Sequence, residues 1–416
     1  MVLLGPVPGA TWTAKGTNQH VQAHGGDITK VGSTYYWIGE NKLSGSAFQS
    51  INCYSSTDLV QWTFVNELLT LQPDGDLGPN RVVERPHVIY NSKTSKYVMW
   101  MHIDSSDYQE GKAGVATSST VCGNYTYLGS SHPLGFQSRD IGLFKDTDGT
   151  GYLLTENRGH GLRIEMLSND YLSVKSMVAC LDGYESPAMY KSNGTYFIFG
   201  SSLTGWNPND NVYSTATSLS GPWSDWNKFA TPWSNTYSSQ TTAVVSINGV
   251  IMYMGDRWVS SNLMSSTYIW LPLTISGTTA SMGYHDSWII NPSAGTWSLA
   301  PAETVVEAEA SANILTAGAI EVTCSGCSNG NAIGTTATTT TIRVQQENGD
   351  PEQRYGNVTV NGVSNIIAFL PSPNGNTPGT SVLTVPLKRG SANVIKFEAY
   401  NGGYVSDIDR LIVPNS

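Results

Sequence analysis

Short aromatic or apolar segments recur five times along the chain, each directly after a tight turn. Their marker residues are Tyr36 (GSTYYWIGE), Tyr97 (SKYVMWMH), Tyr152 (DGTGYLLTE), Tyr196 (NGTYFIFGS) and Ile251 (NGVIMYMGD). The segments have the length and composition of strands, and no helical periodicity beyond about ten residues stands out. Repeats of this size are typical of propellers and solenoids. We therefore expect an all-β fold in which a four-stranded unit is used five times, a five-bladed β-propeller.

Four of these five segments have a polar residue eleven to thirteen positions upstream. The four residues are Glu84, Asp140, Glu185 and Gln240, whereas the first repeat has Gly25 at this position. Equivalent positions of successive blades lie at a similar depth near the axis of a propeller. We interpret this set of polar groups as an active site.

The pattern changes near residue 300, where SAGTWSLAPAETVVEAEAS is the best linker candidate. Beyond it, the segments TTTTIRVQQ, NVTVNG, SVLTVPL, ANVIKFEAY and DIDRLIV alternate as strands and predict a β-sandwich of the jelly-roll kind. A chain of 416 residues is also too long for one ordinary core. We predict a propeller over residues 1–302 and a sandwich module over residues 303–416.

The amino-acid composition limits the classes of molecule that the protein can be expected to bind. The formal net charge is −10, which argues against nucleic acid, and the many Trp and Tyr residues suit a neutral sugar with apolar faces. No run approaches the roughly 18 apolar residues of a membrane span. Sequons at Asn124, Asn193 and Asn357 are compatible with secretion. We expect a secreted, extracellular monomer with no membrane or nucleic-acid partner.

The five cysteines leave one without a partner. Cys53 and Cys122 lie on expected outer strands of consecutive repeats and could pair. Cys324 and Cys327 form a CSGC loop, for which a local disulfide is the favoured interpretation over a metal site. Cys180 remains, and we expect it to be buried.

Cleavage of a glycosidic bond needs a proton donor and, opposite it, a base or nucleophile. Glu185, in GYESP, suits the acid, and Asp140 on the preceding repeat could orient it and raise its pKa by like-charge repulsion. Glu84 is followed by Arg85, which favours the ionised carboxylate, and could accept hydrogen bonds from sugar hydroxyls. Both Glu84 and Arg85 are therefore candidate substrate-binding residues.

Residues 15–300 resemble glycoside hydrolase family 43 in SSTDLVQW, SRDIGLFKDTDG, YESPAMYKSNGTYF and GPWSDW. The segments QAHGGDITKVGSTYYWIGE, VVERPHVIYN, MWMHIDSSDY, SSLTGW and YMGDRW are similar to its exo-β-1,3-galactanase branch. The resemblance implies a five-bladed propeller that releases galactose, with inversion, from the non-reducing end of β-1,3-galactan, the backbone of arabinogalactan. It implies no catalytic cofactor.

Most of the family has an aspartate base on the first blade, where this chain has Gly25. The galactanase branch shares this absence and is thought to use a glutamine, which matches Gln240 as an unusual base or a water-positioning group. Asp27 is a rival, since strand alternation would keep it on the same face as Gly25. Further substrate contacts carried over from the branch are Tyr108, Trp206 as a stacking platform, Asn157 and Arg257.

Two alternatives to a galactanase stay open. The first is another exo-enzyme of the same family, an arabinofuranosidase or a β-xylosidase. The second is a non-catalytic, galactan-binding propeller, which the missing aspartate base would explain.

The C-terminal segment resembles carbohydrate-binding module family 35 in VEAEA and SDIDRLIV. The resemblance implies a structural Ca²⁺ held by Glu307, Glu309 and Asp409, and a galactose contact through Tyr404 and Asp407. Carboxylate oxygens are the ligands that Ca²⁺ prefers. A solvated acidic edge is the alternative.

Overall fold

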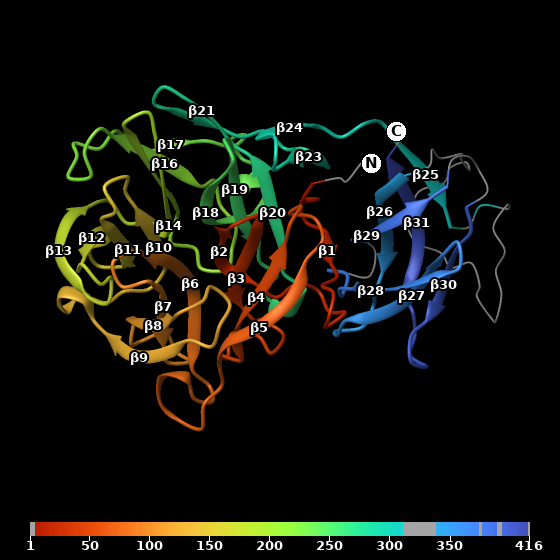
Figure 1. The fold of residues 1–416 in the computed structure, drawn as a ribbon, viewed down its shortest axis with the longest axis horizontal. Helices are drawn as coiled ribbons and strands as arrows, with labels where there is room; N and C mark the ends of the chain where they lie inside the picture. Colours follow the sequence, from red (N-terminus) through yellow and green to blue (C-terminus); the bar gives the residue numbers. More distant parts are fainter. Residues whose placement is uncertain (1–4, 309, 311–337, 374–376, 389–392, 415–416) are drawn as a thin grey trace.

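The structure, a computed structural model, describes residues 5–308, 310, 338–373, 377–388 and 393–414. Strands dominate this part of the chain (Figure 1). Its helices are single turns: η1 (Gly75–Leu77), η2 (Pro133–Gly135), α1 (Asn235–Ser238) and η3 (Leu263–Ser265). None of them is long and apolar enough to cross a membrane. The expectation of an all-β chain is confirmed.

Residues 24–272 form five successive sheets, in which each strand pairs antiparallel with the next. The first two sheets consist of β2 (His24–Val31), β3 (Thr34–Glu40), β4 (Ser50–Ser56), β5 (Thr63–Thr70), and of β6 (Val82–Asn91), β7 (Lys96–Asp104), β8 (Lys112–Ser118), β9 (Thr126–Ser131). The next two consist of β10 (Ile141–Lys145), β11 (Gly151–Asn157), β12 (Gly161–Leu167), β13 (Val174–Cys180), and of β14 (Glu185–Ser192), β15 (Thr195–Ser201), β16 (Val212–Ala216), β17 (Asn227–Lys228). The fifth has three strands, β18 (Gln240–Ile247), β19 (Val250–Arg257) and β20 (Thr267–Pro272).

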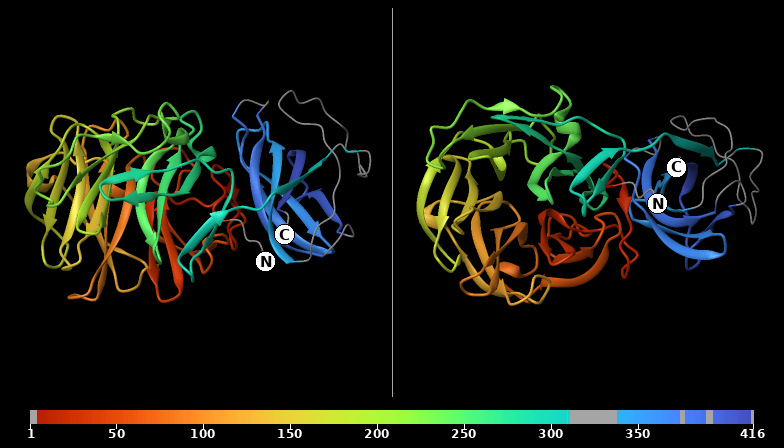
Figure 2. Two further views of the ribbon diagram at one scale, coloured as in Figure 1. Left: turned by 90° about the horizontal axis from the view of Figure 1, so that it is seen from above. Right: turned by 45° about the horizontal axis from the view of Figure 1, so that its top comes forward.

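The five sheets close into a ring. The first strand of each sheet lies against the first strand of the next, and β18 of the last sheet contacts β2 of the first. Figure 2 (right) shows the sheets following one another around this ring. All five first strands therefore line its centre, as expected from the repeats.

Aromatic packing joins the first and last sheets. Trp37 of β3 and Trp270 of β20 are fully buried, with ring centroids 4.4 Å apart. Trp12 packs on both, 5.6 Å from Trp37 and 5.0 Å from Trp270. Its backbone, however, belongs to β1 (Thr11–Trp12), which pairs in parallel with β29 in the C-terminal part. The N-terminal strand β1 therefore pairs outside the ring, although the predicted propeller over residues 1–302 includes it.

The C-terminal part contains two sheets. One has the order β1, β29 (Gly379–Leu387), β26 (Thr338–Glu347), β31 (Asp407–Pro414), β25 (Glu303–Glu307), and the other β28 (Val363–Phe369), β27 (Arg354–Val360), β30 (Ile395–Ala399). Side chains of both sheets, such as Val344, Val358 and Val385, share one hydrophobic cluster. The hairpins β21 (Thr274–Ser276)–β22 (Thr279–Ser281) and β23 (Trp288–Asn291)–β24 (Thr296–Leu299) lie between this part and the ring in sequence.

The two parts are also joined by hydrogen bonds. The backbone N–H of His20 donates to Gln353 (3.0 Å), and that of Ala368 donates to the Thr13 hydroxyl (2.9 Å). Together with the β1–β29 pairing, these contacts mean that the segment before the first sheet contributes to both parts.

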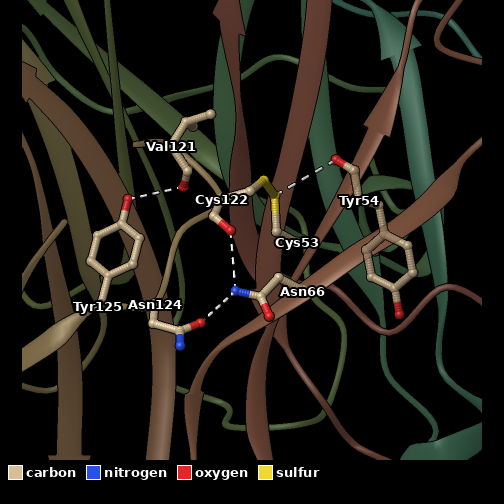
Figure 3. Close-up of a disulfide and its surroundings, with 7 residues drawn as sticks. All are labelled: Cys53, Tyr54, Asn66, Val121, Cys122, Asn124 and Tyr125. Carbon is tan, nitrogen blue, oxygen red and sulfur yellow. Dashed lines mark hydrogen bonds between the residues drawn. A yellow bond between two sulfur atoms is a disulfide. The ribbon is translucent and has the colours of Figure 1, made fainter. Parts of the chain in front are cut away.

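A disulfide links the first two sheets (Figure 3). Cys53 of β4 bonds to Cys122, in the turn before β9, with 5.9 Å between the Cα atoms, so the predicted pairing is confirmed. Asn66 braces the turn, since its amide donates to the Cys122 carbonyl at 3.1 Å. Cys180 is exposed rather than buried, because it ends the outermost strand of its sheet. The predicted pairing of Cys324 with Cys327 lies outside the described residues.

Candidate active site

One polar residue from the start of each first strand faces a residue of the second strand at the centre of the ring. The first-strand residues are His24, Glu84, Asp140, Glu185 and Gln240, with Asp140 directly before β10. Their partners on the second strands are Glu40, His102, Glu156, Ser201 and Asp256. Ten polar groups, most of them buried, are thus collected at one end of the ring.

The register corrects one position of the sequence interpretation. The residue equivalent to Glu84 and Glu185 in the first sheet is His24, whereas Gly25 corresponds to Arg85 and Ser186. A bulge follows the inner residue in these three strands, and the three bulge residues have φ of 65°, 53° and 59°. Because all three strands share this bulge, it does not misplace one of them relative to the others. The first repeat is misplaced because its marker, Tyr36, lies two residues after the start of β3, whereas Tyr196 lies one residue after the start of β15.

Glu185 is buried, with a relative exposure of 2%. Its Oε1 accepts hydrogen bonds from the backbone N–H groups of Thr204 (3.1 Å) and Gly205 (3.0 Å) and from the Gln240 amide (3.1 Å). Its Oε2 lies 3.2 Å from Arg158 Nη2. Burial, and next the Asp140 carboxylate, raise the pKa of Glu185 to about 8, although Arg158 opposes the shift. Glu185 therefore holds a proton at neutral pH.

Gln240 is held from both ends of its side-chain amide. Its Oε1 accepts from Arg85 Nη2 (2.6 Å) and Trp258 Nε1 (2.9 Å), while its Nε2 donates to Glu185 and to the Ser201 hydroxyl (3.2 Å). The two lone pairs of the amide oxygen are thus both used. The side chains of Glu185 and Gln240 point toward one another, as the sequence interpretation requires.

Arg85 lies at the centre of the ring and is buried. Besides Gln240, its guanidinium donates to the Thr241 carbonyl (2.7 Å) and the Ser186 hydroxyl (2.8 Å), and it lies 3.3 Å from Asp140. Asp140 accepts a hydrogen bond from Ser186 at 2.7 Å rather than contacting Glu185 directly. Asp140 thus acts on Glu185 through its charge and through the neighbouring Ser186.

Glu84 belongs to a second group of charges around Lys42. Lys42 Nζ lies 2.9 Å from Glu84 and 2.7 Å from Glu40, with all three side chains buried. Glu84 also accepts from the Tyr108 hydroxyl (2.9 Å) and lies 3.6 Å from His102. Burial alone would raise the pKa of Glu84, but Lys42 and His102 overcome it and lower this pKa. Glu84 is therefore ionised.

The sequence interpretation missed Glu40. A Cβ on Gly25 would stand 2.5 Å from Glu40 Oε1 and 3.2 Å from the Arg85 backbone nitrogen, so the Glu40 carboxylate occupies the space that a side chain at position 25 would need. Burial raises the pKa of Glu40 to about 8, against the Lys42 charge and with the help of Glu84. The signal for such residues lay four or five positions after each marker residue, where Glu40, His102, Glu156 and Asp256 stand.

Asp27 lies on the far side of the bulge, so simple alternation with Gly25 does not hold. Its carboxylate lies 3.1 Å from His87 Nδ1, and within the described residues it makes no hydrogen bond to Glu185, Gln240 or Arg85. The residue pair that adjoins the site here is His24 with Asp256, at 3.0 Å.

Of the other predicted substrate contacts, Trp206 joins the site. Its ring lies 4.8 Å from that of Trp258 and 5.2 Å from Lys42 Nζ, so it bridges the two groups of polar residues. Asn157 ends β11 and accepts the backbone N–H of Gly159 (2.9 Å). Arg257 instead donates to the Tyr237 carbonyl (3.0 Å), away from the Glu185–Arg85 contacts.

The residues predicted to bind calcium and sugar in the C-terminal part lie on β25 and around β31. Glu307 and Asp409 are buried, Tyr404 is 83% exposed and Asp407 is exposed. Glu347 is buried opposite Asp407, and burial together with Asp407 and Asp409 raises its pKa. Among the described residues, no three His, Cys, Asp or Glu are placed to hold a metal ion. Glu309 lies outside the described residues.

A protonated carboxylic acid, an ionised carboxylate and a partly exposed tryptophan, at the centre of an all-β ring, are typical of a glycosidase. Residues 21–250 match the family described as glycosyl hydrolases family 43. The chain belongs to this family, and is a glycoside hydrolase with a β-propeller domain. No curated protein matches the chain.

Solved structures similar to this chain include exo-β-1,3-galactanases. Those of Phanerochaete chrysosporium, determined as a variant with β-1,3-galactotriose and also with galactose, share 37% identity, cover 98% of this chain and 99% of their own, and have a TM-score of 0.71. The exo-β-1,3-galactanase of Clostridium thermocellum shares 28% identity over 96% of this chain and 87% of its own, with a TM-score of 0.67.

Proposed function

We propose that the protein is an inverting, exo-acting glycoside hydrolase that releases galactose from the non-reducing end of β-1,3-galactan, as in the backbone of arabinogalactan. We also propose that the ring is a five-bladed propeller and that the C-terminal part is a sandwich-type module that binds sugar. The protein is proposed to be secreted and monomeric. The similarity to galactanases that bind galactose and β-1,3-galactotriose supports the substrate. The observation that carries the reaction is Glu185, a buried carboxyl that keeps its proton at neutral pH.

Glu185 is the proposed general acid. Because Oε1 accepts three hydrogen bonds and Oε2, among the described residues, accepts only the one from Arg158, the transferable proton belongs on Oε2. Transfer of this proton to the glycosidic oxygen breaks the bond to the anomeric carbon as water attacks from the opposite face. The attacking water gives up a proton to the surrounding solvent, and Glu185 is left as a carboxylate until it takes up a proton again. Asp140 maintains the raised pKa of Glu185. The ionised Glu84 accepts hydrogen bonds from sugar hydroxyls, and the Tyr108 hydroxyl exchanges hydrogen bonds with them.

Gln240 is proposed to position the attacking water. The two donors at Oε1 favour its amide form over the imidic tautomer that a true base would need. Acid and base of inverting enzymes stand roughly 6.5–9.5 Å apart, whereas Gln240 contacts Glu185 directly here. The bound sugar therefore has to break this hydrogen bond and enter between the two side chains.

The experiment for this function is incubation with β-1,3-galactobiose, followed by ¹H NMR of the anomeric proton. We expect α-galactose as the first product. If β-galactose appears first, inversion is contradicted. If galactobiose is not cleaved, the proposed substrate is wrong. Activity on aryl arabinofuranosides or xylosides, without activity on galactobiose, would favour another specificity of the same family.

The raised pKa of Glu185 predicts how activity depends on pH. The acid works only when protonated, so kcat/KM should fall as pH rises through about 8. Asp140→Asn removes a negative charge that favours the protonated form of Glu185. The high-pH limb of the kcat/KM profile should therefore move to lower pH. Asp148→Asn, in an exposed turn, is the control and should leave the limb in place. A limb unchanged by Asp140→Asn would contradict the role of Asp140.

We propose that the C-terminal module holds Ca²⁺ through Glu307, Asp409 and Glu309. Glu307 and Asp409 are buried carboxylates on paired strands, and such groups are hard oxygen donors that suit this ion. When bound, the ion would balance their charge. Calcium at about 100 times its Kd should stabilise the module by about 2.7 kcal/mol. Thermal unfolding with Ca²⁺, with Mg²⁺ and with EDTA checks this, and Asp409→Asn should abolish the shift. An identical melting temperature in all three would contradict it.

A further inference from the structure

The loop from 229 to 239 carries the most exposed large hydrophobic side chain of the described residues. Trp233 is 87% exposed, although a tryptophan normally buries most of its surface. The loop joins β17 to β18 and ends at Gln240, so it lies at the end of the ring where the candidate catalytic residues begin their strands. Trp233 has no role in the site described above.

The backbone around Trp233 is held in one conformation. Asp210 accepts the N–H groups of Trp233 (2.7 Å) and Asn235 (2.8 Å), and the Ser234 hydroxyl donates to the Thr231 carbonyl (2.6 Å). Trp233 has a φ of 69°, in the left-handed region that bulky residues rarely adopt. The loop therefore presents this ring from a strained but firmly bonded turn.

The Trp233 ring has one covered face and one open face. Lys228 Nζ, which is also paired with Asp210 at 2.7 Å, lies 4.4 Å from the ring centroid. This cation contributes a cation–π interaction on its side and restricts the ring. A fixed aromatic plane with a free face binds the apolar face of a sugar ring by dispersion and C–H contacts.

The connection between β15 and β16, which carries Asp210, also contacts the residues around Glu185 and Gln240. Asn211, next to Asp210, accepts hydrogen bonds from the backbone and hydroxyl of Thr241 (both 2.8 Å), directly after Gln240. Thr204 and Gly205, which donate to Glu185, lie on the same connection between β15 and β16 as Asp210. Trp233 thus stands on the rim whose other residues bind Glu185 and Gln240.

We propose that Trp233 is a sugar-stacking platform for the galactan chain on the leaving-group side, beyond the first galactosyl unit after the cleaved bond. This inference rests on the proposed function. An exo-enzyme encloses only the terminal residue of its substrate, so the remaining galactosyl units must leave across the rim. A tryptophan on that rim that is largely exposed and has its backbone bonded to Asp210 is suited to bind one of them.

The test compares substrates of different length. Trp233→Asn removes the ring but keeps a residue that tolerates positive φ, and Trp233→Phe keeps an aromatic face. With polymeric β-1,3-galactan, Trp233→Asn should raise KM about tenfold, the change that 1.4 kcal/mol produces, with kcat unchanged. The change should be absent with β-1,3-galactobiose and smaller for Trp233→Phe. Trp297→Asn, at a half-exposed tryptophan of β24, is the matched control and should act as wild type on both substrates.

The outcomes separate this inference from the proposed function. If the wild-type protein cleaves neither galactobiose nor the polymer, the proposed function fails. The wild-type protein could instead cleave both substrates while Trp233→Asn leaves the KM for each unchanged, or changes the two KM values equally. In that case Trp233 is not a stacking platform, but the proposed function stands.

Discussion

Glu185→Gln should lower kcat on β-1,3-galactan by about 10²–10⁴-fold, the contribution that general acid catalysis commonly makes. The variant keeps an oxygen that can accept the N–H groups of Thr204 and Gly205, but it has no proton to transfer. Because a good leaving group departs without protonation, an aryl galactoside with an acidic phenol should lose far less activity. Steady-state kinetics on the two substrates measures the difference.

The Glu185→Gln experiment also separates an enzyme from a binding protein. Circular dichroism and thermal unfolding should match those of the wild type, and binding of galactose by calorimetry should persist. Equal losses on galactan and on the activated aryl galactoside would contradict the role of proton donor. If the wild-type protein binds galactan without cleaving any substrate, the non-catalytic alternative is favoured.

The repeat pattern was enough to predict the sheets and most of the ring. Four of the five polar positions counted back from the marker residues do stand at its centre, because the first strand and the turn after it together span nearly the same number of residues in each repeat. The first repeat was misplaced by one residue, since its marker Tyr36 stands one position further into the second strand than Tyr196 does, a difference that only the strand register reveals.

The second-strand partners could not be predicted with the same ease. Glu40 ends β3 and His102 lies two residues before the end of β7, in strands whose aromatic residues dominate the pattern. Whether such polar residues face the centre or the solvent depends on strand register. The pairing of strands that are far apart in the chain could not be predicted from the sequence pattern either. The two-residue strand β1 is too short to show a period, yet it pairs with β29 more than 360 residues away, as the register of Thr11 with Ser381 shows.

Lys42→Met should be the most destabilising single change in the site. Lys42 has 2% side-chain exposure and is shared by Glu40 and Glu84, so its loss leaves the ionised, buried Glu84 with only His102 to balance it, whereas Glu40, whose pKa is raised to about 8, keeps its proton. Removing one partner of a buried ion pair typically costs about 3–5 kcal/mol. Chemical unfolding of the variant measures the loss, and activity on galactan should fall with it because Glu84 is no longer held.

A comparison of three variants makes this prediction specific. Lys396→Met, which breaks an exposed pair with Glu398, should cost only about 0–1 kcal/mol. Glu84→Gln combined with Lys42→Met removes the buried charge that Lys42 balances, and should recover part of the stability without restoring full activity. If the double variant were less stable than Lys42→Met alone, the unbalanced charge of Glu84 could not be the cause. Stability would then depend on the contact of Lys42 Nζ with the Trp206 ring rather than on its ion pairs with the carboxylates.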